Sequence, residues 1–152
     1  MSSDLTQTGP TLVYGLINTA NPSLQNGPLT TANTTLGNPA STGSTPNTSL
    51  EITAVEGEGY TGNDTVTYNR IDIGAMFETW GIAPSIPNGP SFTNASDLLS
   101  YLNETYSLNL QVSDINDGQI GADSYPATYT IVIANNSLTY INQLTVTLEA
   151  AS

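Results

Sequence analysis

Apolar and polar residues alternate in two neighbouring segments of the chain, and this pattern predicts a pair of β-strands. Residues 50–55 begin Leu-Glu-Ile-Thr-Ala, with an apolar residue at every second place. Residues 65–71, Thr-Val-Thr-Tyr-Asn-Arg-Ile, are rich in the β-branched and aromatic residues that favour strands. The segment 57–64 between them contains three glycines and is typical of a turn-rich connection. We therefore expect an antiparallel strand pair here.

A helical spacing follows directly after the second of these strands. Asp72 occupies the position of an N-cap, and Gly81 is a suitable C-terminal stop. Between them, four apolar residues fall at positions i, i+3, i+4 and i+7, on one helix face: Ile73, Met76, Phe77 and Trp80. The pattern predicts a helix over residues 73–80. A buried core face explains this stripe better than a ligand cradle does.

A second helix is expected beyond the proline-rich loop 84–90. Asn94 can cap its start, and Asp97, three residues later, matches the acid of a capping box. The buried side of this helix would be formed by Leu98, Leu99, Leu102 and Tyr106.

The C-terminal part of the chain returns to an alternating pattern. Residues 108–112 alternate once, and residues 128–133 and 144–148 form the clearest hairpin of the sequence, with a turn at 135–137. The elements together predict an α+β fold: a small, mostly antiparallel β-sheet domain with two short helices on one face.

The first third of the chain has a different composition. Residues 1–49 contain one charged residue, Asp4, and are rich in Thr, Asn and Pro. Proline removes backbone donors and Asn favours turns, so regular structure should be short here. Only Thr-Leu-Val-Tyr-Gly-Leu-Ile at 11–17 is apolar over the length of a strand. We expect residues 1–49 to form an extended Thr/Asn/Pro-rich N-terminal arm and residues 50–152 to form the globular domain.

The charge balance narrows the classes of partner. The chain has thirteen acidic residues and one basic residue, Arg70, for a net charge of −12. Binding to nucleic acid depends on several Lys and Arg side chains that neutralise phosphates, and an anionic membrane surface repels an acidic chain. The longest apolar run, residues 131–134, is too short to span a bilayer, and the N-terminus lacks the features of a signal peptide. We expect no nucleic acid and no membrane among the partners, and synthesis in a cytoplasm.

The same composition removes most catalytic chemistry. The chain has no His, no Cys and no Lys, the residues that most often supply general bases, strong nucleophiles and Schiff bases. A pair of carboxylates could still act as in glycosidases, but thirteen acidic residues make some pairing unavoidable. We expect a protein that is not an enzyme, with no catalytic residues, cofactor or metal to assign.

One loop keeps a metal alternative open. The segment 114–123 crowds Asp114, Asn116, Asp117 and Asp123 as a calcium loop does. It departs from the EF-hand pattern, because glycine stands at the fifth place and Tyr125 stands where a glutamate would be the last ligand. Asx turns account for the same residues without an ion.

Arg70 is the only cation of the chain. We expect it to pair with a nearby acid such as Asp72, or with a carboxylate of a neighbouring subunit.

A family resemblance rests on several of these segments. Val-Thr-Tyr-Asn-Arg-Ile-Asp at 66–72, Asp-Leu-Leu at 97–99 through Tyr106, Leu-Asn-Leu at 108–110 and Asp-Ile at 114–115 resemble a module of structural virion proteins of large tailed bacteriophages. The resemblance covers about residues 50–149. It implies a non-enzymatic particle component present in many copies.

The sequence thus favours an accessory or decoration component of a tailed-phage virion, whose partners are other virion proteins and copies of itself in a homo-oligomer. A tail or collar structural protein is the first alternative. The second is a carbohydrate-binding or adhesin module that would use Tyr60, Trp80 or Tyr101, although Trp80 belongs to the predicted core stripe.

Overall fold

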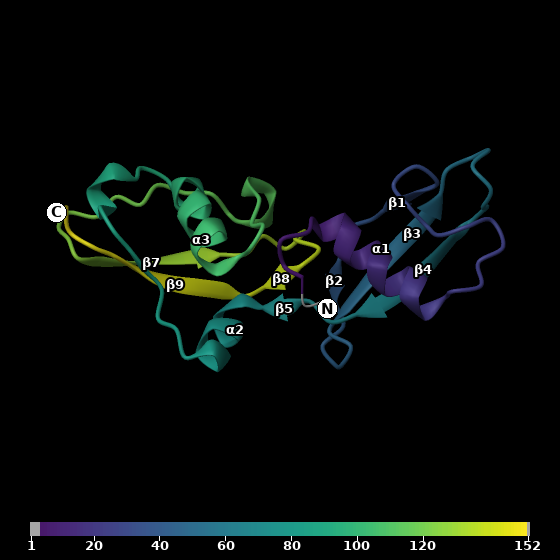
Figure 1. Ribbon diagram of the computed structural model, residues 1–152, viewed down its shortest axis with the longest axis horizontal. Helices are drawn as coiled ribbons and strands as arrows, with labels where there is room; N and C mark the ends of the chain where they lie inside the picture. Colours follow the sequence, from purple (N-terminus) through teal and green to yellow (C-terminus); the bar gives the residue numbers. More distant parts are fainter. Residues whose placement is uncertain (1–3, 152) are drawn as a thin grey trace. The chain divides into compact units, whose positions relative to one another are not determined.

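The computed structural model describes residues 4–151 and divides the chain into two compact units (Figure 1). The first unit extends to Arg70, and the second begins at Ile71. The composition suggests a boundary after residue 49, but the boundary between the two units lies after Arg70. The physical reason is that strands from the Thr/Asn/Pro-rich segment pair with the strand that follows it.

The first unit is a helix on a four-stranded antiparallel sheet. Its elements are α1 (Gly9–Ala20), β1 (Thr34–Leu36), β2 (Ala40–Ser41), β3 (Thr48–Ala54) and β4 (Asn63–Tyr68). Strand β3 is central, because β1 and β2 pair with it on one side and β4 pairs with it on the other. The predicted pair of strands over 50–55 and 65–71 is confirmed as β3 and β4, with β4 starting and ending earlier.

Residues 11–17, whose apolar run has the length of a strand, form the middle of α1 and not a strand. Thr8 caps the helix by accepting a hydrogen bond from the Thr11 amide at 3.4 Å, and Pro10 lies in the first turn. Proline fits the first turn because its fixed φ is helical and its missing amide has no partner there. A continuous apolar run fits a strand as well as a helix, and here burial of one side of it against the sheet makes it a helix.

The core of the first unit is small. Its buried apolar side chains are Leu12, Val13, Tyr14, Leu50, Ile52 and Tyr68. The hydroxyl of Tyr14 accepts a hydrogen bond from the Thr34 hydroxyl at 2.8 Å, which ties α1 to the start of β1. The opposite face of β3, with Glu51 and Thr53, is exposed.

The second unit combines short helices with a three-stranded sheet. Its helices are α2 (Ile73–Trp80) and α3 (Leu99–Tyr106), with single 3₁₀ turns at Gly89–Ser91, Ala95–Leu98 and Val112–Asp114. Its strands are β5 (Ile71–Asp72), β6 (Ser85–Ile86), β7 (Ala127–Val132), β8 (Tyr140–Ile141) and β9 (Gln143–Leu148). The predicted hairpin is confirmed as the antiparallel pair β7–β9, with β6 parallel to β9 on its other edge and a separate parallel pair β5–β8.

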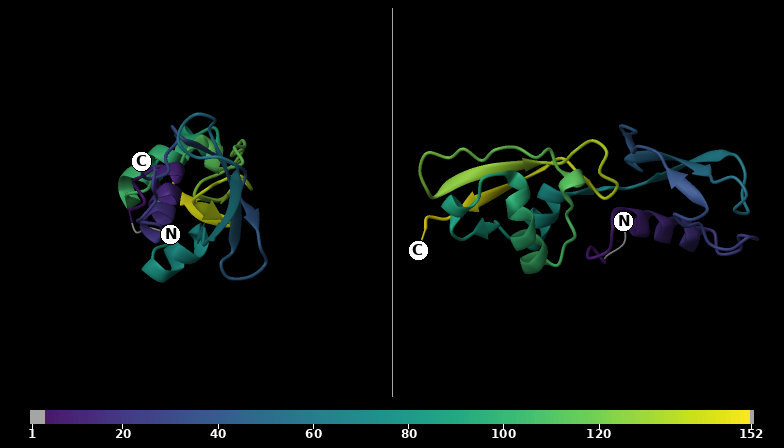
Figure 2. Two further views of the ribbon diagram at one scale, coloured as in Figure 1. Left: turned by 90° about the vertical axis from the view of Figure 1, so that its right-hand side faces the viewer. Right: turned by 90° about the horizontal axis from the view of Figure 1, so that it is seen from above.

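The two helices lie on the same side of the β7–β9 sheet (Figure 2, right). Phe77 of α2 meets Tyr106 of α3 in an edge-to-face contact, with ring centroids 5.0 Å apart. Residue 74 must be glycine for α2 to approach β9, because a Cβ there would lie 2.6 Å from the carbonyl oxygen of Gln143. The buried residues of both helices and of the inner sheet face form one apolar core.

The predicted helix ends are confirmed. Asp72 accepts a hydrogen bond from the Ala75 amide, and Gly81 ends α2 in the left-handed conformation at φ 70°. The capping box of Asn94 and Asp97 is present, although the first turn after it is a 3₁₀ turn that continues into α3.

Three predictions in this unit are corrected, two about the burial of side chains and one about a strand. Trp80 is 43% exposed and not part of the buried core, because it is the last residue of the helix, although its ring contacts that of the buried Phe77 with centroids 5.1 Å apart. Residues 108–112 do not form a strand; Leu108 and Leu110 are buried, but Val112 starts a 3₁₀ turn and is 57% exposed. Tyr106 is only partly buried.

The α+β class is confirmed, with mostly antiparallel pairing. None of the helices between residues 4 and 151 combines the length and the apolar character needed to cross a membrane.

Candidate functional site

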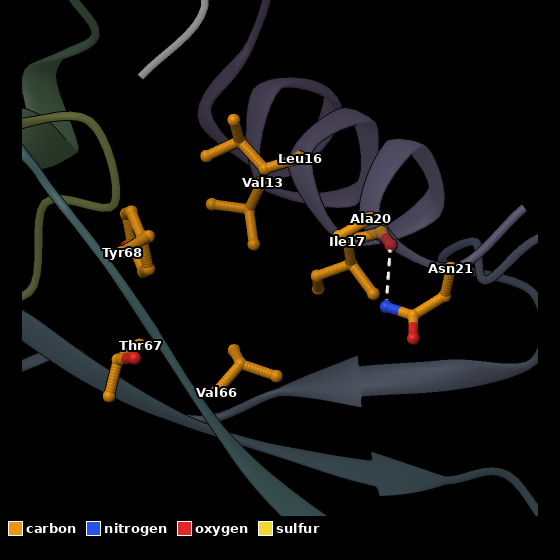
Figure 3. Close-up of a pocket in the computed structure, with 8 residues that line it drawn as sticks. All are labelled: Val13, Leu16, Ile17, Ala20, Asn21, Val66, Thr67 and Tyr68. Carbon is orange, nitrogen blue, oxygen red and sulfur yellow. Dashed lines mark hydrogen bonds between the residues drawn. The ribbon is translucent and has the colours of Figure 1, made fainter. Parts of the chain in front are cut away.

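The clearest hollow of the first unit lies between α1 and the edge strand β4 (Figure 3). It has a volume of about 270 Å³ and a mostly apolar lining. The helix contributes Val13, Leu16, Ile17, Ala20 and Asn21, and the strand contributes Val66, Thr67 and Tyr68.

The hollow exists because α1 covers the sheet unevenly. The Tyr14–Thr34 contact holds the helix toward β1, on the far side of β3 from β4. Leu16, Ile17 and Val66 therefore remain only partly buried, whereas Val13 beside them is 1% exposed. Apolar side chains that a unit leaves half covered are suited to contact another molecule.

A second hollow of about 350 Å³ continues the first one along β4. The two share Ile17, Asn21 and Val66, and the second extends to Tyr60 and Asp64. The hydroxyl of Tyr60 donates a hydrogen bond to the carbonyl of Gly27, which fixes this end of the hollow. We call the combined feature the α1–β4 groove.

The groove is open along the free edge of β4. Within residues 4–151 this strand pairs with β3 alone. The Ala54 amide bonds to the Gly62 carbonyl, so alternation along the pair directs the backbone groups of Asn63, Thr65 and Thr67 away from β3. One of these groups is occupied locally, because the Thr65 amide donates to the Asp64 carboxylate at 2.8 Å.

Asp64 is the only ionisable acid in the lining of the groove. It is exposed, and the loop that leads to Tyr60 adds the exposed Glu56 and Glu58. This end of the groove is therefore negatively charged.

Arg70 is held inside the first unit and is 7% exposed. Its Nε donates to the Thr48 hydroxyl at 2.9 Å, and its main-chain amide donates to the Asn47 side chain at 2.8 Å. Burial lowers the pKa of Arg70, and it raises the pKa of Tyr68 to about 12, although the nearby guanidinium opposes that rise. The side chain acts here as a structural cation.

The predicted ion pair of Arg70 with Asp72 or with a neighbouring subunit remains a prediction. The Asp72 carboxylate accepts hydrogen bonds from the Ala75 amide at 3.1 Å and from the Asn142 side chain at 2.6 Å.

The loop 114–123 uses its acidic residues as turn and cap acceptors. Asp114 accepts from the Gln111 amide at 2.9 Å and from the Ser137 hydroxyl at 2.7 Å, and Asp117 accepts from the Ser96 amide at 2.9 Å. Across residues 4–151, no three acidic side chains lie close enough together to hold a metal ion. The hydrogen bonds favour the Asx-turn interpretation of this loop over the calcium one.

The three aromatic candidates belong to different units, Tyr60 to the first and Trp80 and Tyr101 to the second. Tyr60 lines the groove of the first unit. Trp80 stands exposed at the end of α2, next to the exposed Ile82, and Tyr101 lies partly buried on α3.

The sequence alone did not place Leu16, Ile17 and Val66 together in one groove. A signal for the first two was present, because Val13, Leu16, Ile17 and Ala20 have the i, i+3, i+4, i+7 spacing of a helix face. The position of Val66 on an edge strand depends on the pairing of distant segments, which a local pattern does not contain.

The arrangement defines a class of protein: an α+β chain with a mostly apolar groove beside a strand edge that has no partner within residues 4–151. Residues 2–152 match a family of unknown function, DUF7941, and the chain belongs to that family. No curated protein matches the chain, and no solved structure does.

Proposed function

We propose that this protein is a non-enzymatic structural component of a tailed-phage virion, an accessory or decoration protein that assembles in many copies on the particle. Its partners would be other virion proteins and copies of itself, and a tail or collar position is the alternative within the same class. The family resemblance of residues 50–149 supports the virion setting, and the surfaces described below support the structural role.

The observation that carries the proposal is that each unit leaves one sheet face uncovered and lined mostly by hydroxyl side chains. In the first unit Thr53 and Thr65 lie on this face with Glu51. In the second unit Thr128, Thr130, Val132, Gln143, Thr145 and Thr147 lie on the side of β7 and β9 opposite to the core residues. Broad faces of this kind suit contact between subunits, because short side chains can be buried with little loss of conformational entropy.

The positions of the charged groups agree with a structural role. Asp72, Asp97 and Asp114 cap helical turns by accepting backbone hydrogen bonds. Arg70 is bonded inside its own unit. These charged side chains stabilise the fold, and a structural role requires no further function of them.

Quantitative mass spectrometry of density-purified particles tests this proposal. The phage that encodes the chain should yield particles containing it in tens of copies or more, in constant ratio to the major capsid protein through successive purification steps. A chain that remains in the lysate supernatant and is depleted from the particles would overturn the proposal. Separate analysis of heads and tails decides between the decoration and tail positions.

A carbohydrate-binding module is the second candidate, and the exposure of Trp80 favours it. The predicted burial of this residue argues against a sugar platform, but the residue is 43% exposed. Aromatic rings with one free face can stack on sugar rings through their apolar surface.

Trp80 is the only tryptophan, so its fluorescence reports on this site alone. A saturable spectral shift with defined glycans, lost in Trp80→Leu and kept in Tyr101→Phe, would establish the carbohydrate function. Unchanged emission across a glycan panel would remove this candidate.

A further inference from the structure

We infer that the α1–β4 groove binds an extended segment of a different protein, which adds to β4 as a new strand and carries alternating apolar residues with a Lys or Arg beside Asp64. This inference deepens the proposed function and rests on it for one point, that the different protein is another component of the particle.

The free edge of β4 supplies the main-chain part of such a site. The outward backbone groups of Asn63, Thr65 and Thr67 are spaced at every second residue, as an added strand requires. All three residues are exposed. An extended peptide that pairs here gains main-chain hydrogen bonds whatever its sequence, and alternate side chains then determine specificity.

The groove supplies the side-chain part. In an added strand every second side chain points to the face on which Val66 and Tyr68 lie, which is the face covered by α1. These side chains would enter the hollow of about 270 Å³ and contact Leu16, Ile17 and Val66. The hollow has room for a few aliphatic side chains and offers them a mostly apolar wall.

Charge determines that the occupant is another protein and not a second copy. Every acidic residue near the groove is exposed, and the only cation of the chain, Arg70, is buried. A second copy would therefore bring Asp64, Glu56 and Glu58 toward the same residues without a cation to compensate them. A segment with Lys or Arg at one end complements this charge.

Asp64 also controls access to the edge. Its carboxylate holds the Thr65 amide at 2.8 Å, so an incoming strand must release that amide before it can pair along the whole of β4. A cation on the incoming segment would attract the carboxylate and free the amide. Acidic side chains on sheet edges are a known device against unspecific strand pairing, and here the device would select for basic partners.

A synthetic peptide tests the inference on the full chain labelled with ¹⁵N and with ¹³C methyl groups. The probe is acetyl-Lys-Thr-Val-Thr-Val-Thr-Lys-amide, in which both Lys and both Val side chains point to the same face, and its matched partner has Glu in place of both Lys residues. We expect the Lys probe to cause saturable shifts of the Asn63, Thr65 and Thr67 amides and of the Leu16, Ile17 and Val66 methyl groups. The Glu peptide should bind about tenfold more weakly at low salt, because its ends meet Asp64 and its neighbours.

Three variants give the controls. Asp64→Asn should bring the affinities of the two peptides to within about twofold, which a merely structural role of Asp64 would not do. Leu16→Ser should weaken both peptides, while Thr53→Ala, on the uncovered face of β3, should leave both unchanged.

Each outcome of these titrations either supports or overturns the inference. No saturable shift at millimolar peptide, or shifts centred on another surface, would overturn the inference, and so would equal affinity for both peptides. Shifts of the β4 amides that depend on protein concentration without peptide would identify a second copy as the occupant and also overturn it. None of these results bears on whether the chain is present in particles, so the failure of this inference and that of the proposed function are distinguishable.

Discussion

The two units of the chain have similar lengths but different interiors. Among the described residues, sixteen apolar side chains are buried in the second unit and six in the first, which also buries Arg70, Thr34 and Thr48. The first unit therefore depends more on buried hydrogen bonds, and the second depends on an apolar core. The comparison teaches that the part with the smaller core is also the part that leaves an apolar groove open.

The two units also differ in net charge. Residues 1–70 contain five acidic residues and Arg70, for a net charge of −4, whereas residues 71–152 contain eight acidic residues and no basic one, for −8. The acidic residues of the second unit repel one another, and the larger apolar core of this unit compensates for the repulsion.

The largest effect should come from the core of the second unit. Leu102 is completely buried on α3, so Leu102→Ala should destabilise this unit by about 2–5 kcal/mol through lost burial and the resulting cavity. Denaturant unfolding followed by Trp80 fluorescence measures it. Val112→Ala, at a 57% exposed position, serves as the control and should cost less than about 0.5 kcal/mol. Equal effects of the two substitutions would contradict the core described for this unit.

A smaller effect is expected from the buried polar contact of the first unit. Thr48→Val keeps the shape of the side chain but removes the hydroxyl that accepts from Arg70 Nε at 2.9 Å, and should cost about 1–3 kcal/mol. Hydrogen exchange of the β3 and β4 amides measures it within this unit. Thr53→Val, on the exposed face of the same strand, is the matched control. Unchanged exchange in Thr48→Val would show that apolar packing alone holds the first unit.

Added salt should stabilise the two units to different extents. Screening relieves repulsion among like charges, so raising NaCl from about 10 mM to about 0.5 M should stabilise the second unit by a few tenths to about 1 kcal/mol. The first unit, with half the net charge, should gain less. Hydrogen exchange at both salt concentrations compares them, and a larger gain in the first unit would contradict the charge argument.

Asp97 provides a pH test of the second unit. Hydrogen bonds from the Asn94 and Thr93 amides lower the pKa of this carboxyl below its ordinary value of 3.8. A lowered pKa in the folded state means that the stabilisation is present above pH 3.8 and is lost as the pH falls through the folded-state pKa. The stability difference between the natural chain and Asp97→Asn should therefore shrink on acidification through this range. A stability difference that grows as the pH falls would contradict the lowered pKa of Asp97.

The smallest expected effect is that of metal removal. Because Asp114 and Asp117 accept hydrogen bonds from within the second unit, excess EDTA should leave the melting temperature unchanged within about 1 °C. A fall of several degrees that calcium restores would revive the calcium interpretation of loop 114–123.

Local signals predicted the second unit better than the first. The Asp72 cap, the Gly81 stop and the capping box at Asn94 are chemical features of single turns, so the sequence contains them directly. The run at 11–17 did not reveal its helix, because a continuous apolar segment fits a strand and a helix equally well and long-range packing decides between them.

The groove was beyond local reasoning for a related reason. Its lining combines residues of α1 and β4 that are about fifty positions apart in the sequence, and its open side results from β4 being an edge strand. Exposure of Trp80 depended on where the helix ends relative to the packed face, which the apolar spacing of residues 73–80 does not specify.

Site-specific photo-crosslinking in intact particles tests the central claim most directly, that the free edge of β4 meets another protein of the virion. A photoreactive residue at Thr65 should crosslink in high yield to an extended, Lys- or Arg-containing segment of a different virion protein, while the same residue at Ser44, in the exposed loop between β2 and β3, should give at most a small fraction of that yield. Crosslinks from position 65 that lead only to copies of the same chain, or that match the yield from position 44, would contradict the claim.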